Sequence, residues 1–351
     1  MAGLLAAAVL ACTGCGHGTA AVAGTRDVAF ASGSLQLKGT VQVPEQAPAE
    51  GARRPAVVLV HGSGPQSRDA ELEGQVGMGF GCTVSLFEEL ADGLEAAGFV
   101  VLRYDKRTCG PFNDCADNGY PSPSVMHVVG DLMKDAGAAV RWLAAQKEVD
   151  ASRIYVVGHS EGGQLVPRLL TDVAELRGGV MLAAPYFAID TVMLGQVAFL
   201  DGRVLVSGQS ENKHTVAVLK DLHAQVQALA ELRAGTYQGT RIGGALATYW
   251  KSWMKLGDEA PALAAATPKP ILVLSGDYDW NVPRNETEEW QAAFEAAAET
   301  SAAHETEVLP CVTHAMSCVR QTVPELIKPV DIDCNVDPRV IERVVSFLKR
   351  R

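Results

Sequence analysis

Five short apolar runs without polar alternation are the feature that most constrains the fold of this chain. A strand that is exposed on one face alternates between apolar and polar residues, whereas a strand buried on both faces does not. The runs are rich in valine and therefore predict a mostly parallel sheet with helices on both faces. They are Ala56–Val60, Phe99–Leu102, Ile154–Val157, Gly179–Ala183 and Ile271–Leu274.

Helical patterns lie between these runs, so strand and helix alternate along the chain. Such alternation predicts an α/β fold with a doubly wound sheet. Before the first run, Asp27–Phe30 and Leu35–Val43 alternate in hydrophobicity, which predicts an opening antiparallel hairpin. A short strand is expected at Glu305–Leu309. The predicted helices are Leu86–Ala97, Val125–Ala145, Gly163–Leu176, Glu286–Glu299 and Pro338–Lys349.

One long segment, residues 189–266, separates two of the predicted sheet strands by far more than a crossover needs. We interpret it as a mostly helical cap insertion over the carboxyl edge of the sheet, where ligands bind in such folds. Residues 25–188 and 267–351 then form the core. An extra packing layer without a functional role is the alternative. The aromatic residues of the segment suit either a core or a pocket wall; with Met254 they are Tyr249, Trp250 and Trp253.

Residues 1–24 resemble an export segment. Met1–Ala11 is an apolar run of signal-peptide length that is too short to span a bilayer. Small residues precede Cys12 and Cys15, as in a bacterial lipoprotein cleavage box, although no Lys or Arg precedes the apolar run. We expect an exported protein, periplasmic or anchored to the membrane through a lipid on Cys12 or Cys15.

Export to an oxidising compartment predicts disulfides among the other six cysteines. The short spacing of Cys109 and Cys115 favours a local bridge between them. A metal site on Cys311, His314 and Cys318 is a weaker alternative, since no second paired cluster stands at a usual zinc spacing. The six cysteines are Cys82, Cys109, Cys115, Cys311, Cys318 and Cys334.

The net charge of the chain indicates which classes of binding partner are unfavourable, and its length indicates how large a core it forms. The 351 residues are 48% hydrophobic, which is enough for a large core, and the formal net charge is -11. A strongly acidic chain without a basic patch disfavours nucleic acid and anionic membrane surfaces as partners. We expect a small molecule instead.

The motif Gly158-His159-Ser160-Glu161-Gly162 stands between a predicted strand and a predicted helix. A strained strand-to-helix turn exposes the central hydroxyl only if the residues two before and two after it are tiny. Because the following helix also directs its N-terminus toward the bound group, Ser160 is placed as a nucleophile. The pattern alone arises by chance in a glycine-rich chain, so its meaning depends on finding a base and an acid.

A serine hydroxyl needs a base within hydrogen-bonding reach and a third group that orients the base. Candidates must lie on loops at the carboxyl ends of strands. The loop after Ile271–Leu274 offers Asp277 and Asp279, and the loop after Glu305–Leu309 offers His314.

The order and spacing of these residues resemble the α/β-hydrolase superfamily, which includes bacterial esterases, serine aminopeptidases and dienelactone hydrolases. Its acid often lies in a G-x-x-D-x-x-V-P loop, matched here by Gly276, Asp279, Val282 and Pro283. The resemblance implies Asp279 rather than Asp277 as the acid. It implies His314 as the base, and the other histidines are poorly placed for that role.

Two further segments are similar to bacterial esterases of this superfamily. They are His61-Gly62-Ser63-Gly64-Pro65, followed by Gln66, Arg68 and Asp69, and Arg103-Tyr104-Asp105-Lys106-Arg107, with Thr108 in place of the usual glycine. An oxyanion hole needs two N–H donors. We expect the N–H of Glu161, the residue after the nucleophile, and that of Ser63, with Gly62 as second choice. We interpret Asp105 as structural, holding cations or loop N–H groups.

These assignments predict a serine hydrolase that cleaves small or medium-sized carboxylic esters through an acyl-enzyme on Ser160, without a metal or organic cofactor. A peptidase of the serine aminopeptidase kind is the alternative, because the same triad cleaves amides. Thioesterase or acyltransferase chemistry also remains open, as does a catalytically silent binding fold. Neither the natural substrate nor the oligomeric state is predicted.

Overall fold

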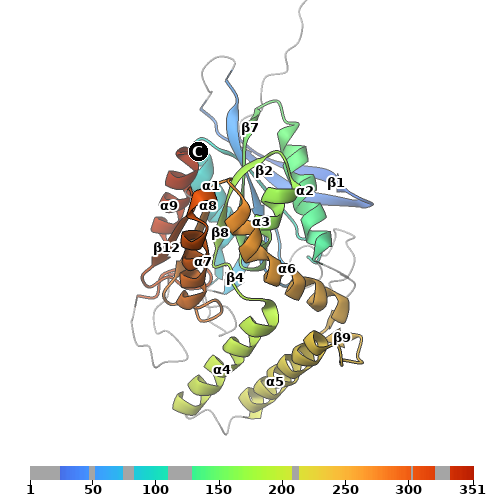
Figure 1. Cartoon of the computed structure of the whole chain (residues 1–351). Helices are drawn as coiled ribbons and strands as arrows, with labels where there is room; N and C mark the ends of the chain where they lie inside the picture. The colour runs from blue at the N-terminus through green and yellow to red at the C-terminus, as the bar shows by residue number, and fades with distance from the viewer. Residues whose placement is uncertain are drawn as a thin grey trace, which may run out of the picture.

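The computed structural model describes residues 24–46, 52–73, 83–109, 129–207, 213–301, 303–320 and 333–351. At its centre lies an eight-stranded sheet (Figure 1). In spatial order its strands are β1 (Gly24–Ser32), β2 (Leu35–Val43), β6 (Val100–Tyr104), β3 (Arg54–Val60), β7 (Val149–His159), β8 (Leu176–Leu182), β11 (Ile271–Gly276) and β12 (Glu305–Leu309).

The first two strand pairs of the sheet are antiparallel and the others are parallel. β1 pairs with β2 as a hairpin, and β2 then pairs with β6 in the antiparallel sense. All neighbours from β6 to β12 run in the same direction. The predicted α/β fold, with a mostly parallel sheet and an N-terminal antiparallel hairpin, is therefore confirmed. Two short strands, β4 (Glu71–Glu73) and β5 (Thr83–Ser85), form a separate pair.

Strand β3 explains why the apolar runs lack alternation. Val58 and Val60 pack into one hydrophobic cluster, while Val57 and Leu59 pack into a second cluster on the opposite face. Since successive side chains of a strand point to opposite faces, every residue of a doubly covered strand must be apolar.

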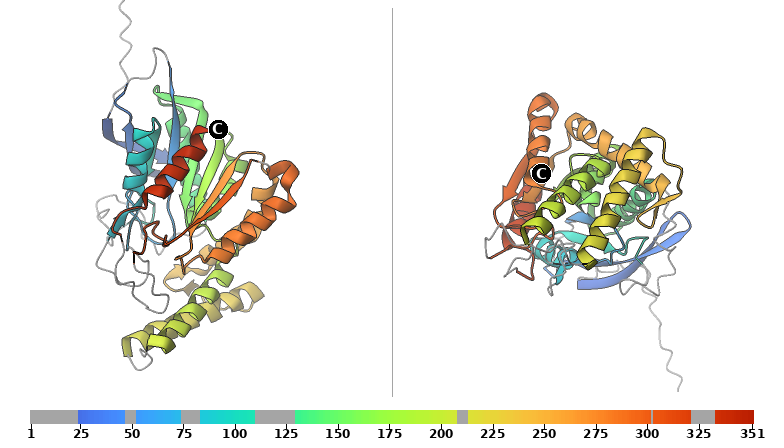
Figure 2. Two further views of the ribbon diagram at one scale, coloured as in Figure 1. Left: turned by 90° about the vertical axis from the view of Figure 1, so that its left-hand side faces the viewer. Right: turned by 90° about the horizontal axis from the view of Figure 1, so that it is seen from below.

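Helices cover both faces of the sheet. In Figure 2, α9 and α7 lie on opposite sides of it, and α1 packs beside α9. The amphipathic helix α9 begins at an Asp337 cap whose side chain accepts from the Arg339 N–H. The helices outside the cap are α1 (Leu86–Ala96), α2 (Gly130–Ala144), α3 (Glu161–Asp172), α7 (Arg284–Ala296), α8 (Ala298–Ser301) and α9 (Pro338–Lys349).

Between β8 and β11 the chain leaves the sheet and forms a helical layer beyond the end of β7, at the lower edge in Figure 1 and in the left view of Figure 2. We call residues 189–266 the cap. In it, α6 packs on α3 of the core, and α4 packs on α5. Its elements are α4 (Ile189–Ser207), α5 (Lys213–Ala234), β9 (Arg241–Ile242), β10 (Ala245–Leu246) and α6 (Ala247–Ala266).

Several helix ends differ from the prediction by one to four residues, and the helix predicted over Glu286–Glu299 is two helices, α7 and α8. The largest difference lies at Leu176. The helix predicted to reach Leu176 ends at Asp172, and Leu176 begins β8. Leu176 and Gly178 pair with Ile154 and Tyr155 of β7. Pairing with β7 therefore decides the structure at Leu176, although the spacing of the apolar residues favours a helix. A local sequence pattern does not contain such long-range pairing.

Several predictions fall outside the described residues. They are the export segment up to residue 23 with Cys12 and Cys15, the start of the helix predicted from Val125, and the bridge partners Cys82 and Cys115. Among the described helices, none combines the length and the hydrophobicity that crossing a bilayer requires.

Candidate active site

Ser160 stands at the turn between β7 and α3 with φ 54° and ψ -118°. A non-glycine residue at positive φ is strained and persists only when its surroundings enforce it. Here the Ser160 N–H donates to the Leu182 carbonyl at 2.8 Å. A Cβ atom on Gly158 would lie 2.1 Å from the carbonyl oxygen of Gly162, so the turn requires glycine at that position. The sequence motif therefore forms the expected strained turn.

The three predicted side chains meet in one hydrogen-bonded row. His314 Nε2 lies 3.1 Å from Ser160 Oγ, and His314 Nδ1 lies 2.7 Å from Asp279 Oδ2. Because Asp279 accepts at Nδ1, that nitrogen carries the proton and Nε2 is the acceptor for the serine hydroxyl. All three groups come from loops at the carboxyl ends of β7, β11 and β12. The row has the geometry of a nucleophile, a base and an orienting acid.

Of the two candidate acids, the structure brings Asp279 to His314. The second oxygen of Asp279 accepts the N–H groups of Asn281 and Val282 at 2.8 and 2.9 Å, which fixes the carboxylate. Asp277 instead accepts the N–H of Cys311 at 2.6 Å. Asp277 thus joins the two loops that carry Asp279 and His314.

The loop after β3 lies directly against the nucleophile turn. A Cβ atom on Gly62 would come within 3.1 Å of Ser160 Cβ. Three successive carbonyls of this loop are held by side chains: Gly62 O accepts from Lys106 at 2.5 Å, Ser63 O from Gln66 at 3.2 Å, and Gly64 O from Thr108 at 3.2 Å.

The carbonyl of Gly62 also fixes the direction of the Ser63 N–H. The two groups belong to one trans peptide and point in opposite directions. Because the carbonyl points to Lys106, the N–H of Ser63 points away from Lys106, and Ser63 lines the same cavity as Ser160. This geometry agrees with the expectation that the Ser63 N–H is the oxyanion donor of this loop. Glu161 begins α3 directly after the nucleophile, where helix N–H groups have no partner within the helix.

A fully buried ion pair lies below this loop. Lys106 Nζ is 3.0 Å from Glu161 Oε2, and the two side chains are 3% and 0% exposed. Tyr249, on α6 of the cap, donates to the other oxygen of Glu161. Burial, with the carboxylate beside it, raises the pKa of Tyr249 well above its usual value, so the phenol remains a donor. This cluster, Lys106, Glu161 and Tyr249, joins the loop after β3, the turn at Ser160 and the cap.

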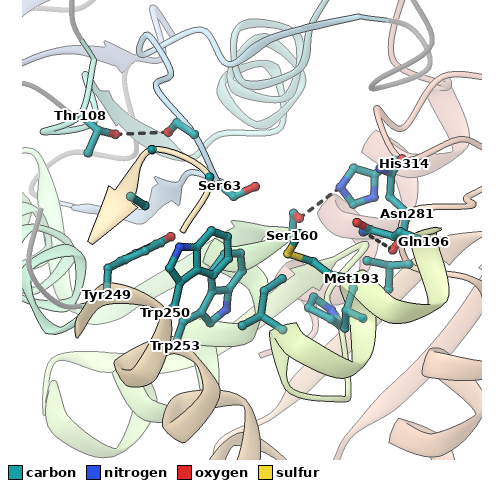
Figure 3. Close-up of a pocket in the computed structure, with 18 of the residues that line it drawn as sticks. Ser63, Thr108, Ser160, Met193, Gln196, Tyr249, Trp250, Trp253, Asn281 and His314 are labelled. Atoms are coloured by element: carbon teal, nitrogen blue, oxygen red, sulfur yellow. Dashed lines mark hydrogen bonds between the residues drawn. The ribbon is translucent and has the colours of Figure 1, made fainter. Parts of the chain in front are cut away.

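The row of Ser160, His314 and Asp279 opens into a cavity of about 700 Å³ between the sheet and the cap (Figure 3). The cap helices supply most of its apolar wall. Among the described residues that line it, none is Asp, Glu, Lys or Arg. From the cap these include Ile189, Val192, Met193, Tyr249, Trp250 and Trp253.

The sequence of this chain matches a known protein family. Residues 76–317 match the family model described as serine aminopeptidase, S33. The chain belongs to this family. Esterase EstD of Thermotoga maritima is 32% identical to it over 237 residues, which cover 67% of this chain and 49% of that protein. The S33-family chain thus spans about half the length of this curated relative.

Solved structures show the same fold at low sequence identity. The α/β-hydrolase GrgF of Penicillium sp. sh18 is 15% identical, with a TM-score of 0.56 and coverage of 93% of this chain and 98% of that one. An esterase of Pyrococcus furiosus is 20% identical, with a TM-score of 0.54 and coverage of 93% and 90%. The α/β-hydrolase fold expected from the sequence is therefore confirmed for this S33-family chain.

Two groups at the site were missed by the sequence reasoning. The sequence assigned no role to Lys106 beyond its place in the Arg103–Arg107 motif, and none to Tyr249 beyond its place among the aromatic residues of the cap. A signal for Lys106 exists, because it follows β6, the neighbour of β3, at the same edge of the sheet as the loop after β3. Asp105 has the expected structural role and accepts from the Arg68 N–H and guanidinium at 2.8 to 3.0 Å.

The structure joins Cys311 and Cys318 in a disulfide with a Cα–Cα distance of 4.9 Å. The metal alternative for these cysteines is therefore wrong, because the sulfurs bond to each other and His314 contacts Ser160 and Asp279. Cys109 and Cys334 are also disulfide-bonded. The predicted partner of Cys109, Cys115, lies outside the described residues.

The Cys311–Cys318 bridge encloses His314, so its removal should affect both stability and turnover. Closing a loop of this length contributes about 2 to 3 kcal/mol in the chain-entropy model. We expect the double variant Cys311→Ser/Cys318→Ser to lose about that much free energy of unfolding and to show a lower kcat. Urea unfolding and steady-state kinetics measure the two effects. Wild-type values for both would show that the loop does not depend on the bridge.

Acid sensitivity is expected from His159, the residue before the nucleophile. Its Nε2–H donates to the His314 carbonyl at 2.8 Å, and burial lowers its pKa to about 3. Between pH 6.5 and about 3 the unfolded state therefore binds a proton that the folded state does not, so stability falls as the pH falls. The loss reaches about 2 kcal/mol at pH 5.

The variant His159→Gln keeps an N–H donor but does not titrate. Urea unfolding at pH 7 and pH 5 should therefore show a smaller loss for this variant than for the wild type, by about 2 kcal/mol. His61, whose pKa is also lowered to about 3 by burial, stays in both proteins and contributes equally. Equal losses in the two proteins would contradict the assignment.

Proposed function

We propose that this chain is a serine hydrolase that cleaves small or medium-sized carboxylic esters through an acyl-enzyme on Ser160. The observation that carries the proposal is the hydrogen-bonded row of Ser160, His314 and Asp279 at the floor of a cavity without charged walls among the described residues. The name of the relative from Thermotoga maritima, an esterase, supports the same chemistry.

In the proposed reaction, Ser160 Oγ attacks the ester carbonyl while His314 Nε2 takes the hydroxyl proton. Asp279 stabilises the imidazolium that forms. The negative charge on the carbonyl oxygen is met by the N–H groups of Glu161 and Ser63, and each such donor contributes roughly 3 kcal/mol to the transition state. His314 then protonates the leaving alcohol. A water molecule, deprotonated by His314, hydrolyses the acyl-enzyme in the reverse order of proton transfers.

The alternative, an aminopeptidase, is favoured by the family's description. A free α-ammonium group buried in a pocket needs a carboxylate partner. Glu161, the acidic residue adjacent to the nucleophile, has its carboxylate occupied by Lys106 and Tyr249. Since no acidic side chain lines the described part of the cavity, its chemistry favours neutral esters.

The test compares two substrate series on the full chain. We expect turnover of p-nitrophenyl esters, little turnover of aminoacyl p-nitroanilides, and labelling by a fluorophosphonate probe at Ser160, located by peptide mass spectrometry. Cleavage of the anilides alone would support the aminopeptidase. Labelling at another residue would overturn the assignment of the nucleophile.

We also propose that the protein is exported. The disulfide between Cys311 and Cys318, and those formed by Cys109 and Cys334, support an oxidising compartment. Mass spectrometry of the mature protein from the native host tests this proposal. It should detect a cleaved N-terminus, with lipid on Cys12 or Cys15 if the protein is anchored.

A further inference from the structure

The cavity has two chemically different sides, and they are held by different parts of the cap. On one side, α6 is fixed by Tyr249, which donates to Glu161, and by Ser252, which accepts from the Val129 N–H at 2.8 Å. On the other side, α4 is fixed by Gln196, which donates to the Asn281 carbonyl at 2.8 Å. Asn281 belongs to the loop of the candidate acid, so α4 lies on the side of His314.

The side formed by α6 is aromatic. Trp250 and Trp253 are stacked, with ring planes 13° apart and centroids 5.8 Å apart. Their indole N–H groups are occupied, since Trp250 donates to Ile242 O and Trp253 to Gln164 Oε1, each at 2.9 Å. The rings therefore offer the cavity apolar surface rather than hydrogen bonds. Flat aromatic surfaces of this kind bind aromatic rings and apolar chains.

The side formed by α4 is aliphatic and amide in character rather than aromatic. Gln196 and Asn281 line it together with apolar Ile189, Val192 and Met193. Figure 3 shows Gln196 and Asn281 near His314, while Trp250 and Trp253 lie across Ser160 from it.

The proton transfer to the leaving group determines whether the alcohol part of an ester lies on the α4 side or on the α6 side of the cavity. The leaving oxygen must lie within hydrogen-bonding reach of His314 Nε2, the group that protonates it. The alcohol part of the ester then extends to the α4 side. The acyl part, bonded to the same carbonyl carbon, extends away from His314 and toward the indole rings.

We propose that the enzyme's substrates are neutral esters whose acyl group is aromatic or a medium-length apolar chain packed on Trp250 and Trp253, and whose alcohol part lies along α4. This inference rests on the proposed ester hydrolysis and adds the orientation of the ester to it. The cavity volume of about 700 Å³ lies in the range of pockets that hold molecules of this size.

The test varies the acyl group and the alcohol separately. With p-nitrophenyl acetate, octanoate and phenylacetate the leaving group is constant. We expect the wild type to prefer the two larger acyl groups. Trp253→Ala should lower kcat/KM for octanoate and phenylacetate about 10- to 100-fold and for acetate less than about threefold, since only the larger groups reach the ring.

Two further variants keep the test decisive if Trp253→Ala fails to fold. Ala245→Leu, in β10 directly before α6, fills space in the cavity without removing a buried ring, and it should likewise penalise only the larger acyl groups. Met193→Ala, on the opposite wall, should leave the ranking of the acyl series as in the wild type. It should change the ranking of ethyl, glyceryl and benzyl esters of one acid.

The possible outcomes separate this inference from the proposed function. If the wild type cleaves none of the esters, ester hydrolysis itself fails. If it cleaves them but Ala245→Leu slows all acyl groups equally, or Met193→Ala changes the acyl ranking, ester hydrolysis stands and the orientation proposed here is wrong.

Discussion

Replacing Ser160 by Ala is expected to lower kcat for ester hydrolysis by about 10⁶-fold, the scale seen when the nucleophile of a triad is removed. Its hydroxyl is the group that lies 3.1 Å from His314 Nε2, and without it no acyl-enzyme forms. Residual turnover would come from the oxyanion donors and bound water alone. Steady-state kinetics and fluorophosphonate labelling measure the loss, and labelling should disappear completely.

The control for this variant is Ser346→Ala, a serine on α9 that contacts Arg350 at the far end of the chain. It should turn over esters and be labelled as the wild type is. Urea unfolding of Ser160→Ala should give a midpoint close to that of the wild type, because only one oxygen is removed. If a folded Ser160→Ala retained more than about a hundredth of the activity, another nucleophile would be responsible.

The second large effect is expected from Lys106→Met. This variant removes the cation from Glu161, whose carboxylate is fully buried, and breaking a buried ion pair from one side costs about 3 to 5 kcal/mol. It also releases the Gly62 carbonyl, which holds the Ser63 N–H in its direction. We therefore expect both a lower free energy of unfolding and a lower kcat, measured by urea unfolding and ester kinetics.

The double variant Lys106→Met/Glu161→Gln separates these two effects. Neutralising the carboxylate removes the cost of an unpaired buried charge, so much of the stability should return. The kcat should stay low, since the Gly62 carbonyl still lacks its donor. If stability and kcat recovered together, Lys106 would act only through charge compensation. A fully stable Lys106→Met single variant would contradict the buried pair itself.

Local sequence patterns predicted the central strands of this fold, because a strand that is buried on both faces has a continuous apolar sequence. Every residue of β3 from Ala56 to Val60 is buried, so the run shows no alternation. The boundary at Leu176 was not predictable in this way, because that residue pairs with a strand about 20 positions earlier in the chain.

The candidate triad was predictable because its members follow strands whose carboxyl ends meet at one edge. The choice of Asp279 over Asp277 came from a resemblance, and the contacts of the two carboxylates agree with it. The bridge between Cys311 and Cys318 was not predicted, because pairing depends on how the loop after β12 folds back on itself. The Tyr249 contact was also not predictable, since it joins residues 88 positions apart through the docking of α6.

The candidate triad and most of the apolar wall lie on separate stretches of the chain. Ser160, Asp279 and His314 come from the loops of the sheet, whereas the helical insertion between β8 and β11 provides most of the apolar surface of the cavity. Exchanging that insertion would therefore change which molecules fit the cavity and leave the three side chains of the row on their own loops. One contact limits such an exchange: Tyr249 of the insertion donates to Glu161, so an insertion without a hydroxyl at this place leaves that carboxylate with one partner fewer next to Ser160.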